Sequence, residues 1–286
     1  MDSGSYRGRL APTPSGDLHI GHALTFLTAF ARARAAHGRL ILRMEDLYAD
    51  HCRMNFADTI VEDLRWLGIR WDEGPDVGGS SSPYVQSARR GFYREIWKRL
   101  NETGAIYPSP QSRKDVEHAL AAPHEGDFDP VFPVELRPER FEKMNVPGAV
   151  NWRFRVNYGE EVSFVDNRAG PQRFVAGRDF GDFVVWCKNG WPSYELAVVA
   201  DDAAMGVTEV VRGGDLLLST ARQILLYRAL GWGVPQFYHC QLVRDEKGAR
   251  LAKRSDSVSI RELRRHGMTP EKIFEMARKG TMCEKG

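Results

Sequence analysis

Two histidines, His19 and His22, stand three residues apart in the segment PTPSGDLHIGH, residues 12–22. The segment precedes an alanine-rich run with apolar residues at helical spacing, so both histidines should fall in the first turn of a helix. Unsatisfied backbone N–H groups and the helix dipole favour an anion there, and imidazole N–H groups add directional donors. Gly16 and Gly21 would let the backbone approach a nucleotide closely. The pattern indicates a phosphate site, although two histidines that only cap the helix would look the same.

A second group of suitable residues lies far along the chain, in GARLAKRSDS at residues 248–257. Arg250, Lys253 and Arg254 stand there in a segment flanked by glycine and serine, after the apolar stretch CQLV, which we interpret as a strand. A mobile basic loop can close over a triphosphate and stabilise the charge that develops on a leaving pyrophosphate. By itself such a loop is most often a solvated basic segment. Together with the two histidines it indicates a nucleotide site in an α/β domain.

The length of 286 residues exceeds one typical domain, and a hydrophobic content of 42% allows a sizeable core. We therefore expect one large domain with an insertion or appendage. Apolar runs are short, and the N-terminal stretch MDSGSYRGRL holds no hydrophobic segment, so we expect a cytoplasmic protein without a membrane partner. The four cysteines form no C-x-x-C pair, which argues against a disulfide framework or a cysteine-built metal site and favours free thiols.

The charge is unevenly distributed along the chain. Residues 241–286 carry 12 Lys and Arg against 7 Asp and Glu, whereas the whole chain has a net charge of +2. A basic C-terminal segment suits contact with a polyanion such as nucleic acid. A solvated helical surface would have the same composition, so the charge alone leaves both interpretations open.

The expected elements begin as strand, helix and strand. YRGRLA and RLILRME have the length of strands, and apolar residues recur at helical spacing over residues 23–31, before Gly38. This order predicts a parallel strand pair with a right-handed crossover, the building block of a doubly wound sheet.

Further helices are predicted at residues 54–67 and 88–103. From residue 106 to 181 the chain is richer in proline, and VNWRFRV and EVSFVDN alternate in the manner of strands, which predicts an inserted, partly β domain. The α/β pattern resumes with YELAVVADDA, TEVVRGGD and the helix STARQILLYRALG. Ser219 and Thr220 are candidates to cap this helix, and its final glycine is the predicted stop.

The two basic motifs together resemble a known family. HIGH at residues 19–22 and RLAKR at 250–254 resemble the paired signatures of class I aminoacyl-tRNA synthetases, and residues 9–257 are similar to the glutamyl branch. The strings that carry this resemblance are RLAPTPSGDLHIGHA, LILRMEDL, LGIRWDEGP, YVQSARR, YELAVVADDA and GGDLLLSTARQILLYRALG. Within that branch the chain most resembles the short glutamyl-queuosine tRNA(Asp) synthetases. It ends 33 residues after Lys253, which we expect to leave no room for an anticodon-binding domain, and it has Val198 where full-length glutamyl-tRNA synthetases usually have Asn.

The resemblance implies an α/β fold, a Rossmann-like doubly wound parallel sheet with an inserted α+β domain and a short helical C-terminal segment. It places the Rossmann-type catalytic domain at residues 1–86 and 190–240, and an inserted acceptor-binding-like domain at 87–189. Residues 241–286 would form a truncated stem-contact-like segment that carries the RLAKR loop.

The resemblance also implies an ATP-dependent ligase. L-Glutamate would react with ATP, accompanied by Mg²⁺, to give glutamyl-adenylate without help from tRNA. Glutamate would then pass to the queuosine base at the wobble position of tRNA(Asp). We expect the RNA to be read as an unstacked anticodon loop and the enzyme to act as a monomer.

Matching motifs imply the roles of individual residues. His19, His22 and Lys253 would be catalytic, Glu45 would bind the α-amino group of glutamate, and Arg212 would bind its side-chain carboxylate in a bidentate fork. Taken by itself, Arg212 would be a strand-end charge that faces water. The ATP-binding set is Gly16, His19, Gly21, His22, Arg250, Lys253 and Arg254. The glutamate-binding set is Arg9, Ala11, Thr13, Glu45, Tyr194 and Arg212.

Family members commonly carry zinc in the inserted domain, on a Cys-x-Cys after a Tyr and on a later Tyr and Cys. The four corresponding positions hold Ser109, Gln111, Phe132 and Leu136, none of which suits tetrahedral Zn²⁺. The neighbouring residues that could improvise a site are His118, His124 and Asp127. We expect no structural zinc and an insertion held by its own apolar residues, such as Phe132 and Leu136.

Two further positions depart from the family. Ala252 stands where the basic loop normally has Ser, so we expect ATP binding to survive with some loss of loop ordering. Glu195 stands where a neutral side chain is common, which leaves the local charge open.

Three other functions fit parts of the pattern. A truncated glutamyl-tRNA synthetase would charge a tRNA 3′ end, but it would do so without an anticodon-binding domain. A nucleotidyltransferase with an H-x-G-H signature would adenylylate a small cofactor precursor, but YELAVVADDA and the long insertion disfavour it. A non-catalytic tRNA-binding or regulatory paralogue is disfavoured by the intact Lys253 and both histidines.

Overall fold

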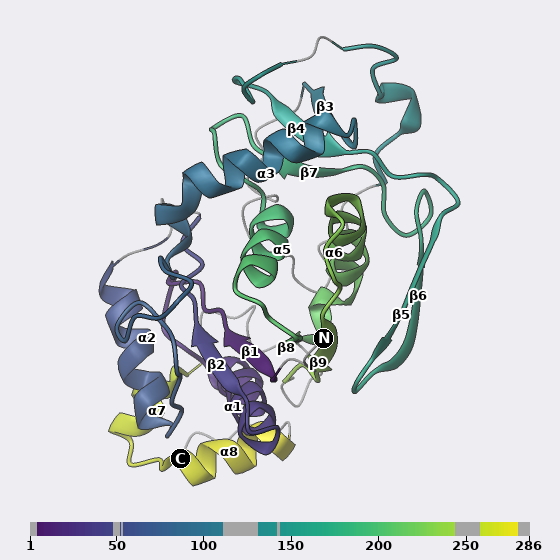
Figure 1. The fold of residues 1–286 in the computed structure, drawn as a ribbon. Coiled ribbons are helices and arrows are strands. Elements are labelled where there is room, and N and C mark those ends of the chain that lie inside the picture. The colour runs from purple at the N-terminus through teal and green to yellow at the C-terminus, as the bar shows by residue number, and fades with distance from the viewer. Residues whose placement is uncertain are drawn as a thin grey trace. The chain divides into compact units, whose positions relative to one another are not determined.

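The computed structural model describes residues 5–47, 52, 54–110, 131–141, 144–243 and 258–279. The chain folds as two compact units (Figure 1). The first unit is Met1–Val85, Val207–Gly214 and Phe237–Gly286, and the second is Gln86–Gly206 and Asp215–Gln236. The residues of interest that lie outside the described part are Gln111, His118, His124, Asp127, Arg250, Ala252, Lys253 and Arg254.

The first unit begins with the expected strand, helix and strand. β1 (Arg7–Leu10) and β2 (Arg39–Leu42) are parallel, in the register that pairs Arg7 with Arg39. α1 (Ile20–Ala35) connects them. Its buried residues recur every three or four positions, which is the spacing of one helix face. They are Ile20, Ala23, Phe26, Ala29 and Ala33. The predicted parallel pair and crossover helix are thus confirmed.

Two later strands lie beside this pair. β8 (Glu209–Gly213) follows Thr208, whose N–H donates to the Arg7 carbonyl at 2.9 Å, and β9 (Gln236–Cys240) is the neighbour of β8. The stretch CQLV was expected to be a strand, but β9 ends at the Cys240 that begins it.

Helices close the core of the first unit. They are α2 (Met54–Trp66), α7 (Ile260–Arg265) and α8 (Pro270–Lys279). Residues from β1, β2, β8, α1 and these three helices form one hydrophobic cluster. Segments that are distant in sequence therefore share one core. The predicted helix at residues 54–67 is confirmed as α2.

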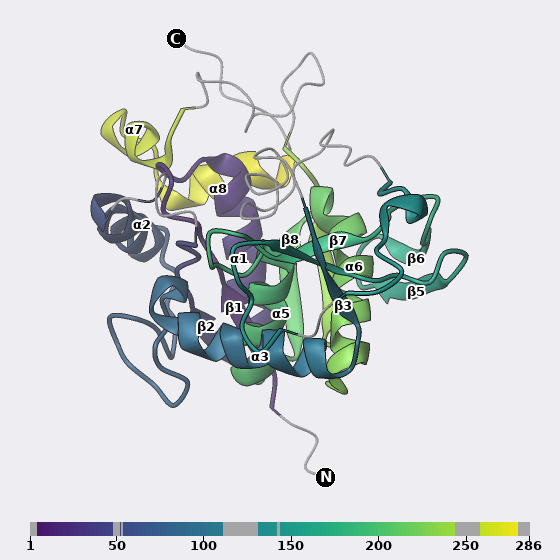
Figure 2. The ribbon, with the colours of Figure 1, turned by 90° about the horizontal axis from the view of Figure 1, so that it is seen from above.

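The second unit contains a three-stranded antiparallel sheet. Its order is β3 (Ile106–Ser109), β4 (Asn151–Phe154) and β7 (Phe183–Trp186). α3 (Arg90–Glu102) follows a 3₁₀ turn at Gln86–Arg89 and packs on the sheet (Figure 2). The contact is aromatic, because the Trp97 ring meets Trp152 edge-on at 4.9 Å and lies 6.5 Å from Trp186. The predicted helix at 88–103 and the strand character of VNWRFRV are therefore confirmed.

A hairpin and two helices complete the second unit. β5 (Glu161–Asp166) and β6 (Gly170–Val175) pair antiparallel, as EVSFVDN suggested for the first of them. α5 (Tyr194–Ala204) and α6 (Leu217–Leu230) lie side by side (Figures 1 and 2). Short 3₁₀ turns occur at Val134–Leu136 and Gly214–Leu216. The unit thus groups α5 and α6 with the inserted segment, whereas the sequence assigned 190–240 to the catalytic domain, an assignment that stays a prediction.

The predicted capping of α6 by Ser219 or Thr220 is wrong. The helix begins at Leu217, directly after a 3₁₀ turn, so both hydroxyls lie inside its first turn. The Thr220 hydroxyl donates to the Leu216 carbonyl at 3.0 Å, the common bond of a hydroxyl within a helix. The predicted stop is confirmed, because Gly231 ends the helix with φ 69°.

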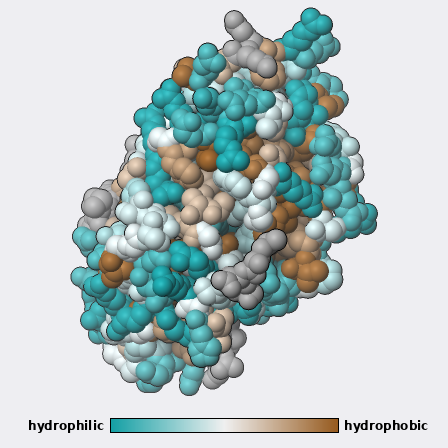
Figure 3. All heavy atoms as spheres, in the orientation of Figure 1, coloured by the Kyte–Doolittle hydropathy of each residue, from teal (hydrophilic) through white to brown (hydrophobic). Residues whose placement is uncertain are grey.

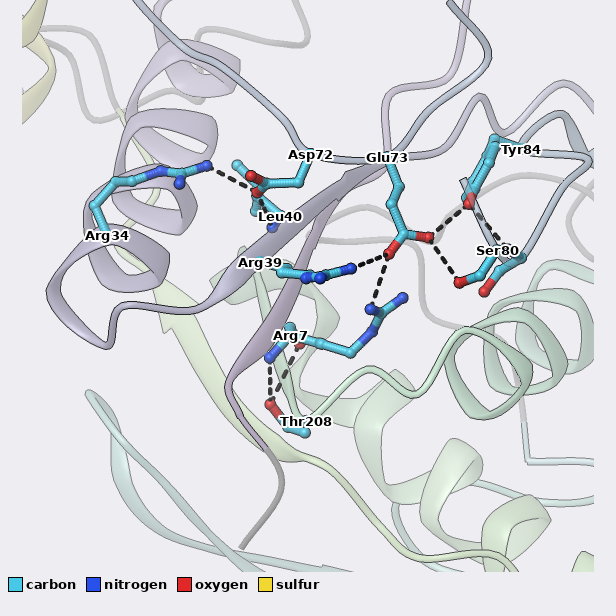
Figure 4. A network of polar contacts seen from close by, with 10 residues as sticks. Arg7, Arg34, Arg39, Leu40, Asp72, Glu73, Ser80, Tyr84 and Thr208 are labelled. Carbon is cyan, nitrogen blue, oxygen red and sulfur yellow. Dashed lines mark hydrogen bonds and ion pairs between the residues drawn. The ribbon is translucent and has the colours of Figure 1, made fainter. Parts of the chain in front are cut away.

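A buried carboxylate links β1 to the segment before residue 85 (Figure 4). Glu73 Oε1 lies 2.9 Å from Arg7 Nη1 and 3.8 Å from Arg39 Nη1, and the Tyr84 hydroxyl donates to Oε2 at 2.6 Å. Gly79 is required beside them, since its φ is +141° and a Cβ there would collide with the Tyr84 oxygen. The network fixes the chain at the amino end of β1.

A second buried carboxylate, Asp182, connects three segments of the second unit. Arg137 donates to both of its oxygens at 2.6 Å, and the Tyr107 hydroxyl donates at 2.5 Å. The Val156 N–H adds a bond of 2.9 Å, while Arg153 donates to the Asp182 carbonyl at 2.7 Å. Burial and the bond to Asp182 raise the pKa of Tyr107, so its hydroxyl stays a donor. Asp182 thereby ties the segment around Arg137 to β3 and to the end of β4.

Among the described residues, no helix is both long and apolar enough to cross a membrane. On the face shown in Figure 3 the surface is mostly hydrophilic, with hydrophobic side chains in small groups.

The cysteines that the structure describes are free thiols, as the sequence predicted. They are Cys52, Cys187 and Cys240. Burial raises the pKa of Cys187 to about 12, so this thiol is protonated at neutral pH and is not a nucleophile.

The Glu73 network makes stability depend on acid. Burial raises the pKa of Glu73, but its bonds to Tyr84 and Arg7 outweigh burial and hold the pKa below the ordinary value of 4.5. A lowered folded-state pKa adds stability that is complete above pH 4.5 and is lost as the pH falls through the folded-state value. We expect Glu73→Gln to lower the free energy of unfolding at neutral pH by about 2 kcal/mol and to flatten its fall in acid.

Urea unfolding between about pH 3 and pH 7 measures this effect. The matched control is Asp58→Asn, an exposed carboxylate on α2, which should keep the wild-type acid profile. An equal fall in acid for Glu73→Gln and the wild type would contradict the assignment.

The Asp182 network should carry much of the stability of the second unit. Asp182→Asn removes the charge that Arg137 faces and should lower the free energy of unfolding by about 3 kcal/mol, because a buried charge loses its partner. Calorimetry of this variant beside Glu95→Gln, an exposed carboxylate on α3, checks the prediction.

Calorimetry of the wild type with EDTA tests whether a bound metal stabilises the region around Asp182. If the Asp182 network and not zinc holds this region, the chelator leaves the unfolding temperature unchanged. A drop in EDTA that added zinc reverses would show that a metal holds it instead.

Candidate functional site

The candidate site lies in the first unit, where β1 and β2 end. Parallel strands have their carboxyl ends at the same edge of a sheet, where ligands bind in open α/β folds. The pairing continues beyond the strands, because the Glu45 N–H donates to the Pro12 carbonyl at 2.9 Å. The residues that follow β1, including Ala11 and Thr13, therefore lie alongside Glu45.

Buried charged side chains surround these strand ends. Arg43 is 0% exposed, and its Nη2 lies 2.9 Å from Glu45 Oε1. Arg9 is also buried, and its Nη1 donates to the carbonyl of Val211 in β8 at 2.8 Å. Breaking a buried pair is costly, so Arg43 holds the Glu45 carboxylate in one position. Arg43 was not among the residues predicted from the sequence, although its spacing of two from Glu45 in LILRMEDL places both on one face of an extended chain.

Arg212 of β8 is buried among residues of β9. Only 4% of it is exposed, so it does not face water as a strand-end charge would. Its Nε donates to Nε2 of His239 at 3.2 Å, and its guanidinium carbon lies 5.8 Å from the centre of the Phe237 ring. His239 was also missed from the sequence. The alternation of QFYHC, which places Phe237 and His239 on one face, was the signal that could have found it.

His19 and His22 lie at the start of α1, as predicted. His19 is the N-cap, and its Nδ1 accepts from the Gly21 N–H at 3.1 Å, while Nδ1 of His22 accepts from the His19 N–H at 3.3 Å. The two rings stack with centroids 3.7 Å apart. A neutral imidazole whose Nδ1 accepts carries its proton on Nε2. Capping the helix and donating to an anion are therefore compatible roles for both histidines.

The two glycines near these histidines differ in what surrounds them. A Cβ at Gly21 would lie 3.0 Å from Cε1 of the His19 ring, so the missing side chain lets His19 cap the helix. Among the described residues, nothing lies within 4 Å of a Cβ at Gly16. Gly21 thus has a structural neighbour that favours a missing side chain, whereas no described neighbour explains Gly16.

The chain that returns from the RLAKR segment joins the site at His19. Ser259 forms a bridge with His19, and the Ile260 N–H donates to the Leu18 carbonyl at 2.7 Å. The basic loop itself lies outside the described residues, but its C-terminal anchor is in direct contact with the histidine motif.

α7 is held on α2 by charge immediately after that anchor. Arg261 Nη2 lies 2.6 Å from Glu62 Oε2, and its Nε lies 3.7 Å from Oδ1 of the buried Asp63. Burial raises the pKa of Asp63, and the nearby Arg261 partly opposes this. The ion pair of Arg261 with Glu62 holds the start of α7 against α2.

One predicted site residue, Tyr194, belongs to the second unit. It begins α5, is buried, and packs with Val198 and Leu216. The neighbouring Glu195 is buried as well, and the Ser219 hydroxyl donates to its two oxygens at 2.6 and 2.7 Å. The charge that the sequence left open is therefore solvated by polar side chains inside the second unit.

Three of the four positions at which the resemblance places zinc ligands are described, and they hold Ser109, Phe132 and Leu136. Ser109 is buried in β3, Phe132 is buried under Arg153 at 4.2 Å, and Leu136 is 62% exposed. Phe132 packs in the insertion as expected, whereas Leu136 does not contribute to a core there. The side chains present do not fit a tetrahedral zinc, and Asp182 with its donors connects the same region.

Comparisons with known proteins agree with this geometry. The family of tRNA synthetases class I (E and Q), catalytic domain, matches residues 5–286. A glutamyl-Q tRNA(Asp) synthetase of Symbiobacterium thermophilum is 49% identical over 93% of this chain and 83% of its own length. A glutamate–tRNA ligase 2 of Nitrosococcus oceani is 39% identical over 96% of this chain, but over 58% of its own length.

Solved structures agree as well. The crystal structure of a glutamate tRNA ligase from Elizabethkingia meningosepticum, in complex with its amino acid, has a TM-score of 0.74 and 27% identity. It covers 93% of this chain, which spans 54% of that chain. The α/β fold class and the resemblance to glutamyl-queuosine tRNA(Asp) synthetases are confirmed. This chain therefore belongs to the class I tRNA synthetases of the glutamate and glutamine family and matches their catalytic domain.

Proposed function

We propose that this protein, an ATP-dependent ligase by its family, activates L-glutamate with ATP and transfers it to the queuosine base at the wobble position of tRNA(Asp). The observation that carries the proposal is the buried guanidinium of Arg212, near the strand ends where Arg9 and Glu45 lie. The proposed RNA substrate comes from the names of the relatives, since glutamyl-Q tRNA(Asp) synthetases match over most of their length.

Glutamate would bind at the ends of β1, β2 and β8. The planar fork of Arg212 matches the side-chain carboxylate, and the Glu45 carboxylate, held by Arg43, matches the α-ammonium group. The chain at Arg9, Ala11 and Thr13 would line the amino acid. The family motif also assigns Tyr194 of α5 to glutamate.

ATP would bind at the start of α1. The Nε2 protons of His19 and His22 and the helix N-terminus would stabilise the phosphates, with Gly16 and Gly21 near the nucleotide. Arg250, Lys253 and Arg254 would close over the pyrophosphate from the basic loop, where Ala252 offers no hydroxyl. Mg²⁺ would accompany the ATP phosphates, whose oxygens are the hard ligands that it prefers.

The chemistry needs no protein nucleophile. The α-carboxylate of glutamate attacks the α-phosphorus in line, pyrophosphate leaves, and glutamyl-adenylate forms without tRNA. A hydroxyl of the queuosine ring then attacks the acyl carbonyl and releases AMP. The anticodon loop would be bound unstacked, through phosphate contacts and base stacking.

A second function is favoured by the glutamate–tRNA ligases among the relatives. They match at 36% to 39% identity, so charging of a tRNA 3′ end by a shortened enzyme is the main rival. The glutamyl-Q tRNA(Asp) synthetases match at 43% to 49% identity, above the ligases, which makes that rival the less favoured one.

Transfer of labelled glutamate separates the two functions. We expect label on purified tRNA(Asp) that contains queuosine and none on tRNA(Asp) from cells unable to make it, because only the modified base offers the accepting hydroxyl. Label on tRNA(Glu) would support the charging enzyme, and no transfer to any tRNA would overturn both.

Lys253→Ala tests whether the basic loop acts in the first step. We expect glutamate-dependent pyrophosphate exchange to fall by roughly a hundredfold or more, since a charge that acts on the transition state is lost. Lys98→Ala, an exposed lysine on α3, should keep wild-type exchange. Full exchange by Lys253→Ala would overturn the role of Lys253, whereas full biological activity of a Lys253→Ala variant that has lost exchange would favour a non-catalytic tRNA-binding paralogue.

A further inference from the structure

We infer that His239 is a positioning residue for substrate specificity, because it sets the orientation of the Arg212 fork. The inference rests on the proposed function, in which Arg212 binds the side-chain carboxylate of glutamate. His239 lies on β9, outside both the HIGH motif at residues 19–22 and the RLAKR motif at residues 250–254.

The first support is a buried hydrogen bond. His239 is 0% exposed, and its Nε2 accepts from Nε of Arg212 at 3.2 Å. The five N–H groups of a guanidinium lie in one plane, so a bond to Nε fixes the direction of the rest. An arginine held in this way loses less side-chain freedom when a carboxylate binds, which raises affinity.

The second support is the face of β9. Phe237, two residues before His239, is buried, and its ring lies 5.8 Å from the Arg212 guanidinium and 6.2 Å from the His239 ring. Alternate residues of a strand share a face, so one strand supplies both a ring for the cation and an acceptor for its Nε–H. Two side chains of β9, Phe237 and His239, therefore fix the position of the Arg212 side chain.

The third support is the backbone of β8. Arg9 donates to the carbonyl of Val211, the residue before Arg212, at 2.8 Å. This bond fixes the main chain from which the Arg212 side chain extends, while His239 fixes the far part of that side chain. The strand and the side chain are thus held independently.

Histidine suits this position for a chemical reason. A neutral imidazole accepts at Nε2, whereas an aliphatic side chain offers no acceptor and a lysine or arginine would repel the guanidinium. Glutamine is the conservative replacement, because Oε1 stands the same number of bonds from Cα as Nε2 and also accepts. Asparagine is one bond shorter and would not reach.

The experiment is steady-state pyrophosphate exchange with glutamate, glutamine and ATP varied in turn. For His239→Leu we expect the KM for glutamate to rise about tenfold and the preference for glutamate over glutamine to fall by a similar factor, with the KM for ATP unchanged. His239→Gln should restore the glutamate KM to within about threefold of the wild type, and His239→Asn should not. The control His266→Leu, at an exposed histidine after α7, should behave as wild type.

The Arg212→Ala variant distinguishes failure of the proposed role of Arg212 from failure of the inference about His239. If it leaves the glutamate KM unchanged, the proposed role of Arg212 fails. If Arg212→Ala raises that KM while the Leu, Gln and Asn substitutions of His239 all leave it unchanged, the inference about His239 is overturned and the proposed function stands. If His239→Leu does not fold, the comparison of Gln with Asn decides, and equal glutamate KM values for these two variants would overturn the inference.

Discussion

The parallel pairing of β1 with β2 is the constraint on which the rest of the first unit depends. Parallel strands need a crossover, and α1 provides it by covering the strands with its buried face. As a result the carboxyl ends of both strands and the N-terminus of the helix face the same edge. The carboxylate of Glu45 and the histidines of α1 are brought to one end of the unit by this single topological fact.

Four buried carboxylates are stabilised in the same way. Glu73, Asp182, Asp201 and Glu195 are each buried, and each accepts from two or more donors. Burying a carboxylate is costly unless it is paired and hydrogen-bonded, so each of these four holds the elements that supply its donors.

The N-terminus of α1 shows how a structural and a chemical role can coincide. The Nδ1 atoms of His19 and His22 satisfy backbone N–H groups of the first turn, which stabilises the helix. The same bonds select the tautomer with a proton on Nε2, which is the donor that a phosphate needs. Ser259 then joins the chain that leaves the basic loop to this turn.

The sequence by itself determined the family, the strand–helix–strand start and the positions of α2 and α3, because periodicity and motif spacing are local properties. It also located His19 and His22 at a helix start. It did not single out Arg43 or His239, because strand alternation gives the face of a side chain but not its buried partner: Glu45 for the first, and for the second Arg212 on another strand, 27 residues away. Local patterns misplaced the caps of α6 because a 3₁₀ turn extended the helix backwards. Only the tertiary structure decides which polar side chains are buried together, since burial joins residues that the chain keeps far apart.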